Sequence, residues 1–261
     1  MLPELLRIGD FPIHTYGVLI ALGFLLCVWV SRREGKRLGI PVERIVDLGF
    51  WSILIGMVGA RILFVITRWQ EFWAAPVDIF RVWEGGLVFY GGPLACLPFF
   101  LWYTKKYGLP RWKILDIAAV AVPLAHAFGR LGCLSSGCCY GIPTGGDWGL
   151  RLHSPLLEAH LQGVPLHPTQ IYEGAGLFVL FFYLRWKRRH KAFDGQLLFL
   201  YAIGYSALRI VVEFFRGDLI RGFVIQDYLS TSQFIALLVI VAAVLAYKMR
   251  EMEWKRAQAL T

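Results

Sequence analysis

Arginines in apolar segments are the residues of this 261-residue sequence that point most directly to chemistry. Arg61, Arg130 and Arg209 fall within, or at the ends of, hydrophobic runs. An arginine at the centre of a membrane-spanning helix costs about 2.5–3.5 kcal/mol on insertion scales, so it usually faces the protein interior and has a partner. Its planar guanidinium group can bind a phosphate or a carboxylate through two hydrogen bonds. These three residues therefore predict an anion site inside a helical bundle.

A polar stripe is predicted on one apolar helix. Tyr205, Arg209 and Glu213 are spaced four residues apart, so they share one helix face. Glu173, Glu213 and Asp116 are the candidate partners of the buried arginines. Two interpretations stay open for this stripe. Glu213 either orients Arg209 for binding, or forms an internal salt bridge that only fixes helix packing.

Glycines accompany two candidate site segments. Arg130 lies in Gly129-Arg130-Leu131-Gly132, and Tyr90 precedes Gly91-Gly92-Pro93. Glycine allows close backbone approach and unusual dihedral angles, which suits an anion site at a helix end. For the second segment a simple helix start is an equal alternative.

The composition predicts the elements that must hold these residues. Hydrophobic residues make up 57% of the chain and charged residues 17%, against about 25% charged in a soluble domain. This excludes an ordinary soluble enzyme, a disordered tail and a disulfide-rich secreted module. We predict an all-α integral membrane protein that forms a single polytopic domain over residues 1–261. The expected membrane-spanning helices are about seven: 13–31, 45–66, 87–104, 114–131, 170–186, 196–215 and 231–247.

Basic residues orient these helices. Most of the 27 lysines and arginines fall in alternate connections, at 32–44, 105–113, 185–191 and the C-terminal tail. The positive-inside rule places these segments in the cytoplasm, with the N-terminus outside and the C-terminus inside. The net charge of +9 then reflects cytoplasmic loops and not nucleic-acid binding. The remaining basic residues are all arginines, which indicates either an outer anion site or an export bias against lysine: Arg7, Arg61, Arg68, Arg81, Arg130, Arg151, Arg209, Arg216 and Arg221.

Two outer connections are long enough to have structure of their own. Residues 67–86 are rich in aromatic side chains, among them Trp69, Trp73 and Trp83, and predict an arm in the lipid headgroup layer. Residues 132–169 predict a small periplasmic head. This head carries Cys133, Cys138 and Cys139, for which a disulfide from Cys133 to either of the others, reduced thiols in packing, and redox or metal chemistry are the alternatives. The Cys-x4-Cys-Cys spacing is not a standard zinc pattern, so we predict no metal and no cofactor.

The ordered set of motifs resembles the prolipoprotein diacylglyceryl transferase family over nearly the whole chain. No single motif is specific, but their order is. The blocks are His14-Thr15-Tyr16-Gly17, Gly59-Ala60-Arg61, Gly85-Gly86 with Tyr90-Gly91-Gly92, Gly129-Arg130-Leu131-Gly132, His167-Pro168-Thr169-Gln170-Ile171-Tyr172-Glu173, and Tyr205 with Arg209 and Glu213-Phe214-Phe215-Arg216.

The resemblance implies a reaction and a location. Phosphatidylglycerol gives its diacylglyceryl group to the thiol of the lipobox cysteine in a prolipoprotein signal peptide, a thioether forms, and glycerol phosphate leaves. The reaction takes place on the periplasmic side of the bacterial cytoplasmic (inner) membrane. The partners are therefore phosphatidylglycerol, the prolipoprotein and the lipid bilayer, without a cofactor or nucleic acid.

The chain departs from the family pattern at two places. Tyr90 stands where the family has a histidine that is often assigned as the general base, and a tyrosine with an ordinary pKa near 10 is a poor base at neutral pH. Either Tyr90 only positions a group, or the base lies elsewhere, or none is needed because a thiol is already partly ionised. Cys133 and Cys138 replace an asparagine and an acidic residue of the family signature.

A mechanism follows as a hypothesis. Arg130 and Arg209 hold the lipid phosphate, Tyr205 and Tyr16 donate hydrogen bonds nearby, and Glu213 orients Arg209. The predicted catalytic residues are Arg130, Arg209, Tyr205 and Tyr90, and the predicted substrate-binding residues are Tyr16, Arg61, Gly91, Gly92, Gly141, Glu213 and Arg216.

Two other functions fit parts of the sequence. A membrane thiol oxidoreductase would use the three cysteines of the head. A non-enzymatic binder or transporter of anionic lipids would use the arginines without forming a product.

Overall fold

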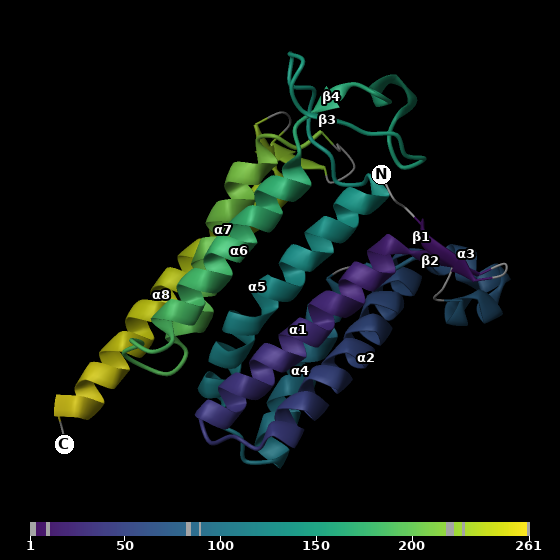
Figure 1. The fold of residues 1–261 in the computed structure, drawn as a ribbon. Helices are drawn as coiled ribbons and strands as arrows, with labels where there is room; N and C mark the ends of the chain where they lie inside the picture. The colour runs from purple at the N-terminus through teal and green to yellow at the C-terminus, as the bar shows by residue number, and fades with distance from the viewer. Residues whose placement is uncertain are drawn as a thin grey trace. The chain divides into compact units, whose positions relative to one another are not determined.

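The computed structural model describes residues 4–8, 11–81, 85–88, 90–217, 222–225 and 228–259, and these residues are mainly helical (Figure 1). Arg221, and Trp83 of the predicted arm, lie outside the described residues. The chain divides into two compact units, one of Ser31–Ile114 and one of Met1–Val30 with Leu115–Thr261. We call them the middle unit and the main unit. The single polytopic domain over 1–261 stays a prediction.

The middle unit is built on a close helix pair. α2 (Val42–Thr67) packs against α4 (Gly91–Lys106), and α3 (Trp69–Ala74) and the 3-10 helix η1 (Pro76–Phe80) lie between them in sequence. A Cβ atom on Gly91 would lie 2.2 Å from the carbonyl oxygen of Gly59, and one on Gly59 would lie 2.4 Å from that of Gly91. The two backbones therefore meet at these glycines, which gives Gly91 a packing role.

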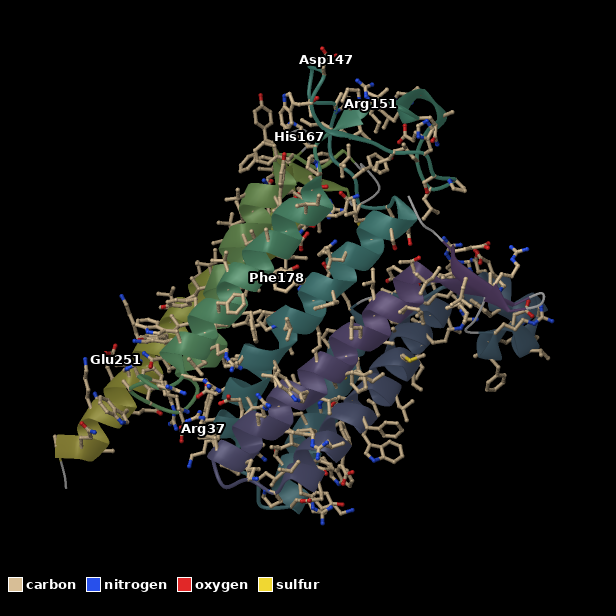
Figure 2. The ribbon with its side chains drawn as sticks, viewed as in Figure 1. Arg37, Asp147, Arg151, His167, Phe178 and Glu251 are labelled. Carbon is tan, nitrogen blue, oxygen red and sulfur yellow. The ribbon has the colours of Figure 1, made fainter. Side chains whose placement is uncertain are left out.

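The main unit contains the other long helices. They are α1 (Thr15–Arg37) and α5 (Arg111–Ser136), each of which has one end in the middle unit, together with α6 (Thr169–Lys187), α7 (Gln196–Glu213) and α8 (Thr231–Ala259). α7 packs against both α6 and α8 (Figure 1). Phe178 of α6, labelled in Figure 2, packs against Phe128 of α5 with 6.1 Å between the ring centroids. The apolar core of the unit is formed by Val30, Ala119, Val120, Ala121, Leu124, Phe181, Leu184 and Leu197.

The segment between α5 and α6, which we call the head, has short strands of its own, and its placement as a periplasmic head stays a prediction. It contains β3 (Leu150–Arg151) paired with β4 (Pro165–Leu166), and a short 3-10 helix, η3 (Ala159–Leu161). Figure 2 labels Asp147, Arg151 and His167 in this segment. A core of its own holds it together, made of Tyr140, Leu152, Leu157 and Leu166.

Two further hairpins were not predicted. β1 (Glu4–Ile8) pairs with β2 (Phe11–His14) before α1, and β5 (Phe223–Ile225) pairs with β6 (Leu229–Ser230) before α8.

Five of the seven predicted segments are helices that are long and apolar enough to cross a membrane: α1, α2, α5, α7 and α8. α4 is a helix of 16 residues, about 24 Å long, which is shorter than the roughly 30 Å of a bilayer core. α6 has 19 residues, but it carries Gln170 and Glu173 near its start and Arg185 and Lys187 in its last turn. The membrane character is confirmed, whereas the count of seven spans stays a prediction.

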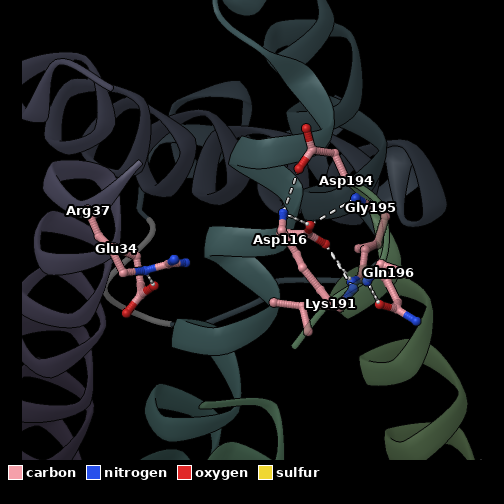
Figure 3. Close-up of polar contacts among 10 residues, drawn as sticks. Glu34, Arg37, Asp116, Lys191, Asp194, Gly195 and Gln196 are labelled. Carbon is pink, nitrogen blue, oxygen red and sulfur yellow. Dashed lines mark hydrogen bonds and ion pairs between the residues drawn. The ribbon is translucent and has the colours of Figure 1, made fainter. Parts of the chain in front are cut away.

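A buried carboxylate determines where α7 begins. Asp116 accepts hydrogen bonds from the backbone N–H groups of Gly195, Leu197 and Leu198 at 2.8–3.2 Å, which are N–H groups that a helix start leaves unsatisfied. The ammonium group of Lys191 lies 2.8 Å from the same carboxylate (Figure 3). Asp116 is thus a helix cap, and the prediction that it is a partner of a buried arginine is wrong.

Candidate active site

Three arginines converge on one buried carboxylate in the main unit. Glu173, in the second turn of α6, is 1% exposed. Its Oε1 lies 2.9 Å from Nη2 of Arg130, and its Oε2 lies 3.6 Å from Nη1 of Arg209 and 3.9 Å from Nη1 of Arg216. We call Glu173, Arg130, Arg209 and Arg216 the arginine cluster.

The polar stripe predicted on α7 is present and belongs to this cluster. Arg209 forms an ion pair with Glu213, one turn further along the helix, and its Nη2 donates to Oγ of Ser232 at 3.2 Å. The hydroxyl of Tyr205 donates to Oε1 of Glu173 at 3.2 Å. The pairing of Arg209 with Glu213, and the partnership of Glu173 with Arg130 and Arg209, are thereby confirmed.

Arg130 reaches the cluster from the last turns of α5. Its Nε is buried without a hydrogen-bond partner among the described residues, although Nη2 contacts Glu173. This leaves one guanidinium N–H directed at no acceptor. Gly132 lies against the ring of Tyr16, where a Cβ atom would be 3.0 Å from Cδ2. The glycine therefore allows the half-exposed Tyr16 to lie beside the end of α5.

Gly141 positions Arg216 through the backbone. The two residues form an isolated antiparallel bridge, with Ile142 N–H donating to Phe215 O at 2.9 Å. A Cβ atom on Gly141 would lie 2.5 Å from the carbonyl oxygen of His167. A larger residue would separate the head from the end of α7 and displace Arg216.

The predicted site residues of the middle unit have other contacts. Arg61 is buried and donates to the carbonyl oxygens of Gly85 at 2.7 Å, Ile79 at 2.9 Å and Gly86 at 3.0 Å, and also to that of Asp78. It thus holds the segment after α2 in place. Any role of Arg61 toward a substrate stays a prediction.

Tyr90 and the two glycines after it open α4. Tyr90 is the N-terminal cap residue of this helix and is 52% exposed. Gly92 faces Gly56 of α2, where a Cβ atom would lie 3.5 Å from the carbonyl oxygen. The helix-start interpretation of Gly91 and Gly92 is therefore sufficient for their geometry, and a binding role stays a prediction.

Three thiols adjoin the arginine cluster. None of the five cysteines, all of which lie in the described part of the chain, forms a disulfide, and Cys133, Cys138 and Cys139 are each partly exposed. Hydrogen bonds from the thiols of Cys133 and Cys138, together with the charge of Arg216, lower the pKa of the Cys139 thiol. Cys139 therefore takes its negative charge more readily than an isolated thiol does.

The sequence of the whole chain resembles one group of enzymes. Residues 3–249 match the family model described as prolipoprotein diacylglyceryl transferase. A phosphatidylglycerol–prolipoprotein diacylglyceryl transferase of Clostridium tetani is 35% identical over 248 residues, which cover 95% of this chain and 97% of the relative. A second such transferase, from Clostridium perfringens, is 33% identical over 254 residues, 96% of each chain. One from Halalkalibacterium halodurans is 33% identical over 245 residues, 93% of this chain and 84% of the relative.

The chain belongs to the prolipoprotein diacylglyceryl transferase family. This confirms the resemblance inferred from the ordered motifs, and it makes the chain a membrane transferase. Of the residues predicted for its site, the structure gathers Arg130, Arg209, Arg216, Tyr205 and Glu213 around one point.

Sequence reasoning named Glu173 only as a possible partner, and not as the residue on which three arginines meet. The signal was present, because a carboxylate near the start of an apolar helix needs positive partners. His126, whose Nε2 lies 3.9 Å from Oε1 of Glu173, was also not predicted as part of the cluster.

Proposed function

We propose that the protein transfers the diacylglyceryl group of phosphatidylglycerol to the lipobox cysteine thiol of prolipoproteins. The observation that carries this proposal is the convergence of three guanidinium groups on the buried carboxylate of Glu173. A guanidinium group binds a phosphate through two parallel hydrogen bonds, so three of them gathered at one point favour the binding of such an anion. The names of the relatives agree with a lipid phosphate as that anion.

Arg130 and Arg209 are the residues that would bind the phosphate of the lipid. Arg130 has an unpartnered buried N–H, and both side chains lie on long flexible stems that can turn from Glu173 toward a new anion. Arginine stays protonated at every relevant pH, so it can stabilise both the bound phosphate and the charge that develops as this group leaves.

The neighbours of these two arginines would position them. Glu173 and Glu213 hold Arg209 from two sides, and the hydroxyl of Tyr205 lies beside Glu173. Tyr16, at the start of α1, supplies a second hydroxyl near the end of α5.

The reaction is a displacement at the glycerol carbon that carries the phosphate. The substrate thiolate attacks this carbon, a C–S bond forms, and the C–O bond to phosphate breaks. The electron pair of the broken bond leaves with glycerol phosphate, and the thiol proton goes to solvent or to a nearby base. A thiol with a pKa near 8.5 is already a few per cent ionised at neutral pH, and neighbouring guanidinium groups increase that fraction.

The distribution of charge along α6 supports a periplasmic location for the site. Glu173 lies near the start of this helix, whereas Arg185 and Lys187 lie in its last turn, about 20 Å away along the axis. With the basic end in the cytoplasm, the arginine cluster faces the periplasmic side of the inner membrane. We include α4 and α6 as the sixth and seventh spans, with the N-terminus outside and the C-terminus inside.

One assay tests the proposal. Purified full-length protein in vesicles that contain phosphatidylglycerol is incubated with a lipobox peptide, and the products are measured by mass spectrometry. We expect a diacylglyceryl mass gain on the peptide cysteine and an equal amount of glycerol phosphate. The same peptide with serine in place of cysteine is the control and should gain no mass.

Two other outcomes of this assay would overturn the proposal. Oxidation of the peptide thiol without a gain of lipid would identify a thiol oxidoreductase. Saturable binding of phosphatidylglycerol with neither product would identify a lipid binder or transporter.

A further inference from the structure

The transfer reaction proposed above does not use the three thiols beside the arginine cluster. The sulfur atoms of Cys133, Cys138 and Cys139 all lie within 4.8 Å of one another. Each of these residues is partly exposed, so a small solute can reach them. The sequence spacing alone favours no metal site, but the fold gathers the sulfurs in a way that the spacing does not suggest.

The end of α5 brings the first two thiols together. Gly137, with a φ of 71°, ends the helix in a left-handed conformation. The N–H of Cys138 then donates to Cys133 O at 3.2 Å and the N–H of Gly137 donates to Leu134 O at 3.3 Å, which is the hydrogen-bond pattern of a Schellman turn. This turn folds the chain back, so Cys138 lies over Cys133.

The third thiol is held in an unusual backbone conformation. Cys139 has a φ of 61° and is the only residue other than glycine with a positive φ in the described part of the chain. A non-glycine residue in this region costs free energy, and such strain is concentrated at functional sites. Because its neighbour Cys138 is fixed by the Schellman turn, this conformation determines where the Cys139 side chain can lie.

Buried side chains of α6 hold both backbone carbonyls of the cysteine pair. Thr169 Oγ1 donates to Cys139 O at 2.7 Å, and Gln170 Nε2 donates to Cys138 O at 2.8 Å. Both donors are 1% exposed. The cysteine pair is therefore fixed before any ligand arrives, which reduces the entropic cost of binding one.

We propose that Cys133, Cys138 and Cys139 bind one Cu(I) ion in a three-coordinate thiolate site. Thiolates are soft ligands that select Cu(I), zinc and iron–sulfur clusters. With metal–sulfur bonds of about 2.3 Å, a trigonal site needs sulfurs about 4.0 Å apart, so the observed grouping needs only small side-chain movements.

The number of ligands favours Cu(I) over zinc. Structural zinc takes four protein ligands. Among the described residues, the group that could hold a metal here has three members, with no histidine or carboxylate within reach as a fourth. Three thiolates with Cu(I) carry a net charge of −2, and Arg216 and Arg130 lie close enough to offset part of it.

A competition titration tests this proposal without any activity measurement. Full-length protein in detergent, reduced and kept free of oxygen, is titrated with Cu(I) in the presence of bicinchoninate as a coloured competitor. We expect one tightly bound Cu(I) per chain. X-ray absorption of the loaded protein should give three sulfur neighbours at about 2.3 Å.

Single serine variants locate the site. We expect Cys133→Ser, Cys138→Ser and Cys139→Ser each to weaken Cu(I) binding at least about 100-fold with unchanged helix content. The matched controls Cys27→Ser and Cys96→Ser should bind as the unchanged protein does. Three independent variants keep the test decisive if one of them fails to fold.

Four results would overturn the proposal. The first two are Cu(I) binding that survives in all three serine variants, and no bound Cu(I) when one equivalent per chain is added. The third is a higher affinity for Zn(II) than for Cu(I). The fourth is a stable disulfide among the three cysteines in protein that is isolated without reductant.

Discussion

Two buried carboxylates of the main unit are held in opposite ways. Asp116 accepts three backbone N–H groups at the start of α7 and one ammonium group, all at 2.8–3.2 Å (Figure 3). Glu173 receives no backbone N–H among the described contacts. It faces three guanidinium groups at 2.9–3.9 Å and the hydroxyl of Tyr205.

The difference agrees with the proposed roles of the two residues, Asp116 as a structural carboxylate and Glu173 as a carboxylate of the proposed phosphate site. Backbone donors at a helix start are fixed by the helix, so Asp116 has partners that cannot move to another anion. The guanidinium groups around Glu173 lie on flexible side chains, and two of the three contacts are longer than a good hydrogen bond. In the function that we propose, the lipid phosphate replaces Glu173 as the hydrogen-bond partner of these arginines.

The largest expected effect follows from removing either of the two arginines that we propose bind the phosphate. Arg130→Ala and Arg209→Ala should each lower the rate of diacylglyceryl transfer at least about 100-fold, because each removes a charged donor that stabilises the leaving phosphate. The rate is measured by mass spectrometry with a lipobox peptide.

Arg151→Ala is the matched control for these two variants. Arg151 is an exposed arginine of the head whose Nη1 donates to Gly163 O at 3.0 Å. Its removal should leave transfer unchanged. If either Arg130→Ala or Arg209→Ala turns over at the wild-type rate, the residue replaced in that variant does not bind the phosphate.

The two carboxylates provide the next prediction. Glu173→Gln should lower kcat by about 10- to 100-fold, because misplaced guanidinium groups lose their alignment with the phosphate. Asp116→Asn should leave kcat of the folded protein unchanged and lower its melting temperature by on the order of 10 °C, since breaking a buried ion pair costs about 3–5 kcal/mol.

Turnover and thermal unfolding, measured on both variants, decide this comparison. If the Glu173→Gln protein turns over at the normal rate, Glu173 has only a structural role, like Asp116. An Asp116→Asn protein that stays folded but inactive would contradict the purely structural role of Asp116.

A smaller effect is expected from Glu213→Gln. Arg209 keeps its contacts with Glu173 and Ser232 in this variant, and the amide oxygen of the new side chain can still accept a hydrogen bond, so transfer should fall only about 5- to 10-fold. Combining it with Glu173→Gln should be non-additive, because both carboxylates hold the same guanidinium group. Strictly additive effects would indicate that they act separately.

The smallest effect is expected at Tyr90. Tyr90→Phe should change transfer by about threefold or less, and the rise of the rate with pH should keep its midpoint, because this rise reflects ionisation of the substrate thiol. The measurement is a pH–rate profile of both proteins. If the rate of the Tyr90→Phe protein no longer rises with pH, the phenol group of Tyr90 takes part in proton transfer.

Local spacing made part of the site predictable. The stripe of Tyr205, Arg209 and Glu213 follows from the fixed geometry of a helix, so the sequence alone determines which face they share. The long apolar helices were predictable for the same reason, since length and hydropathy are properties of a continuous segment.

Long-range contacts account for what was not predicted. Nothing local distinguishes Asp116, which caps a helix about 80 residues away, from Glu173, which collects three arginines. Arg61 has the same sequence signal as Arg130, but carbonyl groups 17 to 25 residues further along the chain receive its hydrogen bonds. Only the fold tells which buried arginines meet a buried carboxylate.

Phosphate binding by the arginine cluster is tested most directly by a structure of the full-length protein with phosphatidylglycerol bound. The account predicts that oxygens of the lipid phosphate lie within about 2.7–3.2 Å of guanidinium nitrogens of Arg130 and Arg209. A lipid phosphate bound elsewhere, with both guanidinium groups still directed at Glu173 and Glu213, would contradict it.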